Sequence, residues 1–295
     1  MLSPADVKFY QDQGYLVVPD VLDAATLANI RAELARLLDG ARAVTTHTDR
    51  YDLEPGHRPD EPRVRRIKQP HRFYPVFQDL MRHPRLLAVL QGLLGRDVRL
   101  HGSKINLKSP RYGSPVEWHQ DWAFYPHTND DLLAVGVMLD DTTLENGAMY
   151  IIPGSHKGPT YNHHDPEGYF CGAMDIEAAG IDLSKKVACE GPAGSCSFHH
   201  VRMVHGSAQN TSSKSRGLLL YEMGAADAYP LIAVGKFGWD ALHERMVYGE
   251  DTIEPRMREA PIRMPYPPAR GQGSIYESQT RVGKRYFDMK EPAKV

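Results

Sequence analysis

Residues 132–152 read LLAVGVMLDDTTLENGAMYII, two short apolar runs separated by a polar turn. The same unit, a β-rich run followed by a turn rich in Gly, Pro and Asn, recurs through the middle of the chain. The predicted strands cover residues 98–107, 132–139, 149–152, 186–188, 195–198 and 216–222. Many short strands divided by such turns indicate a sandwich or a jelly roll.

Helices are predicted on the N-terminal side of these strands. Ser3 precedes Pro4 and is followed three positions later by Asp6, which is typical of a helix start, and this helix should reach about Gln13. Apolar residues at helical spacing predict a longer helix over residues 24–38. Two short helices are expected at about 75–82 and 84–94.

We therefore expect an all-β core with flanking helices, that is, a double-stranded β-helix of the jelly-roll, cupin-like type. The whole chain is interpreted as one domain. It would comprise a helical preface at 1–95, the jelly-roll core at about 96–225, and a C-terminal segment at 226–295 that wraps the barrel or assists assembly.

Composition excludes several classes of protein. The 295 residues include 35 Lys and Arg against 37 Asp and Glu, and this balance argues against a nucleic-acid-binding protein. No apolar run approaches the roughly 18 residues of a membrane helix, and the sequence after Met1 shows no secretory signal. We expect a cytoplasmic protein, monomer or homodimer, that acts on a small molecule without nucleic-acid or membrane partners.

The chain has three cysteines, Cys171, Cys189 and Cys196. Their spacing matches neither a disulfide framework nor a Cys-rich zinc site. We expect reduced thiols without a functional role.

The stretch Glu117–Trp122, EWHQDW, contains two candidate metal ligands. In a strand, residues i and i+2 point to the same side, so His119 and Asp121 would offer a nitrogen and a carboxylate oxygen to one space. A His-x-Asp pair also occurs without any metal. His205, 86 positions after His119, adds a third candidate. Two histidines and one carboxylate form the facial triad of non-haem Fe(II) oxygenases.

Arg216 follows His205 by 11 residues and begins a predicted strand. An inward-facing Arg can hold a planar carboxylate through two hydrogen bonds, and the hydroxyl of Ser207 could share it. With these residues the sequence resembles the phytanoyl-CoA dioxygenase family over most of residues 4–225. The resemblance rests on Phe9-Tyr10, Gly14 to Val17, Asn106-Leu107-Lys108, Trp118 to Trp122, Leu144 to Met149, Ile152 to Lys157, and His205-Gly206-Ser207 with Arg216.

The resemblance implies a cofactor set of Fe(II), 2-oxoglutarate as co-substrate, and O2. It implies six site residues: Fe(II) ligands at His119, Asp121 and His205, and 2-oxoglutarate contacts at Arg216, Ser207 and Asn106. Related halogenases replace the carboxylate ligand by a small residue, which makes room for chloride. Because Asp121 is present, this chain is expected to oxidise its substrate rather than to chlorinate it.

The predicted function is hydroxylation of an unactivated C–H bond of a small molecule, a natural-product intermediate, with release of succinate and CO2. The same iron site would serve desaturation, epimerisation, ring formation or endoperoxide chemistry. A metal-binding jelly roll without oxygenase activity is a further alternative, because this architecture carries many functions. Release of succinate from 2-oxoglutarate would discriminate between these two classes.

The substrate pocket is predicted from nearby aromatic, sulfur-containing and basic side chains. Trp122, Tyr125 and Met138 could line it, although such residues are as often core. The polar residues 39–72 are interpreted as a surface loop that could close as a lid. Within that loop, Arg65 in the basic run Arg63–Lys68 could meet an anionic group of the substrate. A solvated loop is one alternative, and the alternation of the run also fits a strand edge aimed at an anionic ligand.

Five other histidines are assigned no metal role. His199 and His200 precede the third ligand and would face opposite ways in a strand, and neither matches the family's ligand position. His156 is expected to fix a turn. His163 and His164 are expected on the surface of a polar insertion.

Overall fold

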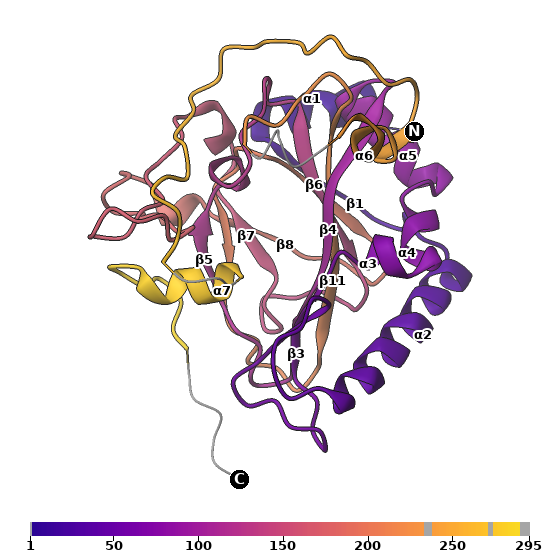
Figure 1. The fold of residues 1–295 in the computed structure, drawn as a ribbon, viewed down its shortest axis with the longest axis vertical. Coiled ribbons are helices and arrows are strands. Elements are labelled where there is room, and N and C mark those ends of the chain that lie inside the picture. The colour runs from indigo at the N-terminus through magenta and orange to yellow at the C-terminus, as the bar shows by residue number, and fades with distance from the viewer. Residues whose placement is uncertain (1, 233–237, 271–273, 290–295) are drawn as a thin grey trace.

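Two antiparallel sheets face each other in the computed structural model, which describes residues 2–232, 238–270 and 274–289 (Figure 1). The eight-stranded sheet has the order β1-β9-β6-β11-β4-β3-β2, with β12 paired to β4, and the four-stranded sheet has the order β5-β10-β7-β8. The large sheet contains β1 (Tyr15–Val18), β2 (Tyr51–Leu53), β3 (Val64–Lys68), β4 (Val98–Lys108), β6 (Leu132–Met138), β9 (Cys196–His200), β11 (Arg216–Ala225) and β12 (Met246–Tyr248). The small sheet contains β5 (Val116–His119), β7 (Met149–Ile151), β8 (Val187–Cys189) and β10 (His205–Ser207). The predicted jelly-roll architecture is confirmed.

Helices precede the core and cover the outer face of the large sheet (Figure 1). They are α1 (Pro4–Gln13), α2 (Ala24–Gly40), α3 (Pro70–Phe73), α4 (Pro75–Leu80) and α5 (Pro84–Leu94). Two short helices follow late in the chain, α6 (Trp239–His243) and α7 (Ile275–Ser278), and α7 lies beside β5 of the small sheet. The predicted start of α1 is confirmed, because Ser3 and Asp6 form a reciprocal capping box.

The turn after α1 depends on Gly14 and His156. Gly14 adopts a φ of 79°, and a Cβ there would lie 2.4 Å from Nδ1 of His156. Nε2 of the same imidazole donates to the carbonyl of Gln11 at 3.1 Å. His156 therefore lies where a turn-fixing residue was expected.

Alternation along the strands separates an apolar outer face from a polar inner face. On β4, Ile105 and Leu107 belong to the large hydrophobic cluster with the helices. Because successive side chains of a strand point to opposite faces, Lys104, Asn106 and Lys108 face the space between the sheets. The helices thus bury the apolar face, and the polar face is left to line a cavity.

Part of the polar segment 39–72 is sheet, contrary to the predicted lid. β3 pairs with β4, placing Arg66 opposite Asn106, and β2 pairs with β3. Arg66 and Lys68 lie 3.1 and 3.2 Å from the carboxylate of Asp52, so a basic run is accommodated within a sheet. Arg65 is itself buried, so the solvated-loop alternative is also wrong for this strand.

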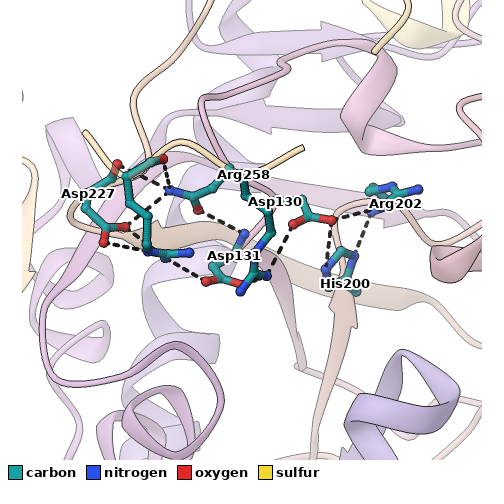
Figure 2. Close-up of polar contacts among 8 residues, drawn as sticks. Asp130, Asp131, His200, Arg202, Asp227 and Arg258 are labelled. Carbon is teal, nitrogen blue, oxygen red and sulfur yellow. Dashed lines mark hydrogen bonds and ion pairs between the residues drawn. The ribbon is translucent and has the colours of Figure 1, made fainter. Parts of the chain in front are cut away.

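The C-terminal segment runs over the outside of the sheets and returns beside β5 as α7 (Figure 1). A chain of ion pairs fixes its middle part to the residues before β6, as Figure 2 shows. Arg258 lies 2.9 Å from Asp131 and 3.5 Å from Asp130, and Arg202 lies 2.9 Å from the other oxygen of Asp130. These ion pairs hold the middle part of the segment against the start of β6.

The remaining features are the lengths of the helices and the state of the three cysteines. Within the described residues, no helix is long and apolar enough to cross a membrane. Cys171, Cys189 and Cys196 are free and buried in the described chain, and burial raises the pKa of Cys189 to about 12.

Candidate functional site

Three residues predicted as metal ligands meet between the two sheets. His205 on β10 lies directly opposite His119 on β5, and the centroids of their rings are 4.1 Å apart. Asp121 begins a one-turn 3-10 helix after β5, and its Oδ1 lies 3.8 Å from Nε2 of His119 and 4.0 Å from Nε2 of His205. The three possible ligand atoms all lie within 4.8 Å of one another, and all three residues are buried.

Backbone carbonyls orient both imidazoles toward this common space. Nδ1 of His119 donates to the carbonyl of Glu117 at 2.8 Å, and Nδ1 of His205 donates to that of Met203 at 3.0 Å. Each ring therefore presents the lone pair of Nε2 to the space shared with Asp121.

Burial lowers the pKa of His119 to about 4 and that of His205 well below its usual value. Both rings are neutral at pH 7, which is the form that binds metal. Two neutral imidazoles and one carboxylate on one side of the space are a donor set that fits Fe(II).

Arg216 lies at one end of the cavity that contains these ligands. Its Nη2 donates to the carbonyl of Gly147 at 2.9 Å, whereas its buried Nε and Nη1 have no hydrogen-bond partner within the described chain. Burial lowers the pKa of Arg216 to about 10, so the side chain remains charged at neutral pH. Buried donors without a partner call for an acceptor, and a carboxylate is a strong acceptor for guanidinium N–H groups.

The two other predicted 2-oxoglutarate contacts line the same cavity as Arg216. Ser207 enters from β10 and Asn106 from β4, and Oδ1 of Asn106 accepts no hydrogen bond from any described residue. The structure therefore brings together all six residues that the resemblance implied. Their individual roles in binding 2-oxoglutarate stay predictions.

Lys108 lies next to Arg216 and is only 2% exposed. Burial and the charge of Arg216 together lower the pKa of Lys108 well below its usual value. Its Nζ donates to the carbonyls of Ser114, at 2.9 Å, and Ala208. Lys108 therefore ties the loops around the Arg216 end of the cavity.

His199 is a residue of the site that the sequence interpretation missed. It lies on β9, lines the cavity, and places Nε2 3.4 Å from Oδ2 of Asp121. His200 faces the other way, toward Asp130, at 4.0 Å (Figure 2). The expected alternation is correct, but alternation alone does not say which of two adjacent histidines faces inward.

The predicted substrate contacts separate into two groups. Trp122 packs in a cluster with Leu132, and its Nε1 donates to the carbonyl of Pro261 at 2.8 Å, while Met138 packs beside Leu218. Neither Trp122 nor Met138 is among the described residues that line the cavity.

Tyr125 is likewise not among the described residues that line the cavity, but it lies near Asp121. Its ring stacks on His101 with 4.4 Å between centroids. Burial and the charge of Asp121 raise the pKa of Tyr125 well above its usual value.

Arg65 contacts α7 rather than the cavity. It forms an ion pair with Glu277 and lies 4.4 Å from the centroid of the Tyr276 ring. Its neighbour Arg66 lines the cavity, together with Ile275 and Tyr276 of α7. The cover of the cavity is therefore α7, more than 200 residues along the chain from the segment that was predicted to close it.

His163 is buried, contrary to the expected surface position. Its Nε2 accepts from the backbone N–H of Gln120 at 2.9 Å, and its Nδ1 donates to the carbonyl of Tyr161. Because Gln120 lies between two metal ligands, His163 fixes the backbone of the ligand loop. His164 is half-buried.

Residues 10–218 match the family model described as Phytanoyl-CoA dioxygenase (PhyH). The chain belongs to the phytanoyl-CoA dioxygenase family. It is accordingly an oxidoreductase of the Fe(II)- and 2-oxoglutarate-dependent dioxygenase class, and the His119, Asp121 and His205 cluster is the candidate metal site in its structure.

Individual relatives cover nearly the whole chain. A protein described as a probable alpha-ketoglutarate-dependent hypophosphite dioxygenase, from Stutzerimonas stutzeri, is 39% identical over 94% of this chain and 97% of its own length. The structure of the carbocyclase SnoK from nogalamycin biosynthesis is 26% identical, with a TM-score of 0.64 over 88% of this chain and 94% of that one. EctD from S. alaskensis with 2-oxoglutarate and 5-hydroxyectoine is 25% identical, with a TM-score of 0.65 over 88% of each chain.

Proposed function

We propose that this dioxygenase hydroxylates a small anionic substrate and that hypophosphite is the first candidate. The observation that carries the cofactor chemistry is the position of Arg216, whose two buried, unpaired N–H groups lie in the same cavity as the metal ligands. The relative that covers 94% of this chain supports the substrate. Conversion of hypophosphite to phosphite would insert one oxygen atom into a P–H bond. The second oxygen atom would enter succinate as 2-oxoglutarate loses CO2.

The protein's own residues supply position and exclusion of water. Iron and 2-oxoglutarate, when bound, supply the oxidising chemistry. His119, Asp121 and His205 would hold the metal from one side, which leaves its other side open to the cavity. Arg216, with Ser207 and Asn106, would fix the distal carboxylate of 2-oxoglutarate.

The side chains of α7 close the cavity beside this end. Ile275 and Tyr276 line it, and Arg65 holds the helix through Glu277. Covering the site in this way keeps water from the reacting groups.

Hydroxylation of a C–H bond in an organic anion is a second candidate. It is favoured by Met149, Leu218 and Leu220, which give the cavity an apolar wall that an inorganic anion does not need. The earlier expectation of a natural-product intermediate belongs to this candidate, and the likeness to SnoK supports it.

The test incubates the purified protein with Fe(II), 2-oxoglutarate, O2 and hypophosphite, and measures phosphite by phosphorus NMR and succinate by chromatography. We expect equal amounts of the two products, and neither product from the Asp121→Ala variant. Succinate without phosphite would overturn hypophosphite as the substrate and leave the organic anion. Failure to form succinate with any anion would overturn the oxygenase function itself.

A further inference from the structure

The wall of the cavity carries basic and acidic side chains. The basic residues Arg66, Lys104, Lys108 and Arg216 line it, together with the carboxylates of Asp121 and Glu222. Asp121 is assigned to the metal, and Arg216, with Lys108 beside it, lies at the 2-oxoglutarate end. Lys104 and Arg66 each face one carboxylate, Glu222 and Asp52, and have no role in the parts of the site described above.

Strand register places these two cations on the same face. Arg66 on β3 lies opposite Asn106 on β4, and Lys104 is two residues before Asn106 on β4. Arg66 and Lys104 are thus diagonal neighbours on the inner face, at the spacing of about 7–8 Å that long side chains can bridge. A single bound group with two acceptor atoms can meet both.

Lys104 retains donors for a ligand. Its Nζ lies 2.8 Å from Oε1 of Glu222, and an ammonium group has three N–H donors. Burial opposes the charge of Lys104, but the carboxylates of Glu222 and Asp121 outweigh it and raise its pKa. The side chain is therefore a cation whose charge is felt at the metal ligand Asp121.

Glu222 is held in place by the neighbouring strand. Gly102 lies opposite it, and a Cβ at Gly102 would be 2.8 Å from Oε2 of Glu222. The absence of a side chain at Gly102 leaves room for this carboxylate, which in turn orients the ammonium group of Lys104.

Arg66 also has donors that are not satisfied. Its Nε lies 3.1 Å from Oδ2 of Asp52, but the geometry is that of an ion pair and not of a hydrogen bond. Nε and Nη2 are buried and make no hydrogen bond to any part of the chain that the structure describes. Buried N–H groups of this kind are usually matched by an acceptor, and Arg66 lines the cavity, from which a ligand could supply one.

We propose that Lys104 and Arg66 form an oxyanion subsite, opposite the metal ligands, that binds the charged group of the substrate and selects small oxyanions over neutral molecules. This inference rests on the proposed function, because it concerns the substrate of the same site. Glu222 is a positioning residue that orients Lys104. Lys104 lies four residues along β4 from Lys108, the register partner of Arg216, and Arg66 lies beside Asn106 between Lys104 and the end where the distal carboxylate of 2-oxoglutarate is expected.

Binding without turnover tests the subsite directly. The protein is loaded with Mn(II) and 2-oxoglutarate and titrated calorimetrically with methylphosphonate, or with tert-butanol as a neutral molecule of similar shape. We expect methylphosphonate to bind and tert-butanol not to bind. Lys104→Met and Arg66→Met should each weaken methylphosphonate binding at least tenfold and change the Kd of 2-oxoglutarate less than threefold.

Lys157→Met is the control. Lys157 is exposed, lies 3.4 Å from the carboxylate of Asp12, and is not among the described residues that line the cavity. This variant should bind methylphosphonate as the wild type does. Lys104→Gln, which keeps the length and polarity of the side chain, replaces Lys104→Met if circular dichroism shows that the latter is unfolded.

Three results would overturn the proposal. The first is that the wild type binds methylphosphonate and tert-butanol equally well. The second is that either cavity variant binds methylphosphonate as tightly as the wild type does. The third is that a cavity variant loses as much affinity for 2-oxoglutarate as for methylphosphonate. Because the assay measures binding to the Mn(II) form, its result does not depend on whether the protein has oxygenase activity. The subsite and the proposed function can therefore fail independently.

Discussion

Nε2 of His199 lies 3.4 Å from Oδ2 of Asp121, although His199 belongs to the large sheet and Asp121 directly follows a strand of the small one. The other oxygen of the same carboxylate, Oδ1, faces the two histidines predicted as ligands, at 3.8 and 4.0 Å. The carboxylate thus has one oxygen directed to the metal space and one directed to His199. This arrangement favours binding of the metal through a single oxygen of Asp121.

Replacing His199 should therefore weaken iron binding without removing a ligand. We expect His199→Phe to lower the affinity for Fe(II) by about 10- to 100-fold, the usual effect of losing such an outer partner. His199→Gln, which can still donate to Asp121, should recover part of the loss. Affinity is measured anaerobically by competition with a chelator.

His200→Gln is the control for this experiment, since His200 is adjacent on β9 but faces Asp130. Its iron affinity should equal that of the wild type. Wild-type affinity in His199→Phe would show that His199 does not act on Asp121.

Arg216→Lys should raise the KM for 2-oxoglutarate far more than the KM for the substrate. A lysine offers a point charge in place of a guanidinium whose Nε and Nη1 have no partner among the described residues. Loss of a hydrogen bond to a charged group costs about 1.5–3 kcal/mol, so the KM should rise at least about tenfold. Steady-state kinetics with each substrate varied in turn provide the measurement. An unchanged KM for 2-oxoglutarate would place its distal carboxylate elsewhere.

The role of the ion pair between Arg65 and Glu277 of α7 can be tested by replacing Glu277. Glu277→Ala removes both the ion pair with Arg65 and the capping box with Ser274. Because Tyr276 would then cover the cavity less well, the KM for 2-oxoglutarate should rise several-fold with little change in Tm. Glu177→Ala, which removes an exposed ion pair with Lys284, serves as control and should leave the KM unchanged. Equal KM values for the two variants would argue against a cover formed by α7.

The metal ligands and Arg216 could be predicted from the sequence because their residue types and spacings are themselves the signal. The side chains on the inner face of the large sheet could not be predicted in this way. Lys104, Arg66 and His199 depend on which face of β4, β3 and β9 is turned inward, and this depends on where the helices pack.

The helical preface and most strands followed from local patterns, whereas a strand at β3 was only one of the alternatives for its basic run. Its basic side chains are typical of a loop, and only the carboxylate of Asp52 on the neighbouring strand explains why Arg66 and Lys68 lie in a sheet. The contact of Tyr276 with the cavity is equally invisible in the sequence, because it joins segments far apart in the chain.

Acid should destabilise the metal-free protein through its buried neutral histidines. Burial lowers the pKa of His71 to about 4 and that of His127 to about 3, from 6.5. The unfolded chain then binds more protons than the folded one below about pH 6.5, so the free energy of unfolding falls as the pH drops from 6.5 toward 4.

His71→Gln should reduce this pH dependence by up to one proton, because glutamine does not titrate but can still reach the hydroxyl of Ser103. Urea unfolding at several pH values between 7 and 4 gives the slopes. The same slope in the variant and the wild type would show that His71 is not the group responsible.

The central claim is that Fe(II) and 2-oxoglutarate bind together at His119, Asp121 and His205. The decisive measurement is an anaerobic titration with Fe(II) in the presence of 2-oxoglutarate, following the visible charge-transfer absorption of a 2-oxo acid chelated to ferrous iron. We predict that the wild type forms this absorption with one equivalent of iron, and that His119→Ala, Asp121→Ala and His205→Ala, each folded by circular dichroism, do not. A wild type that forms no such absorption, or a ligand variant that forms it fully, would contradict the account.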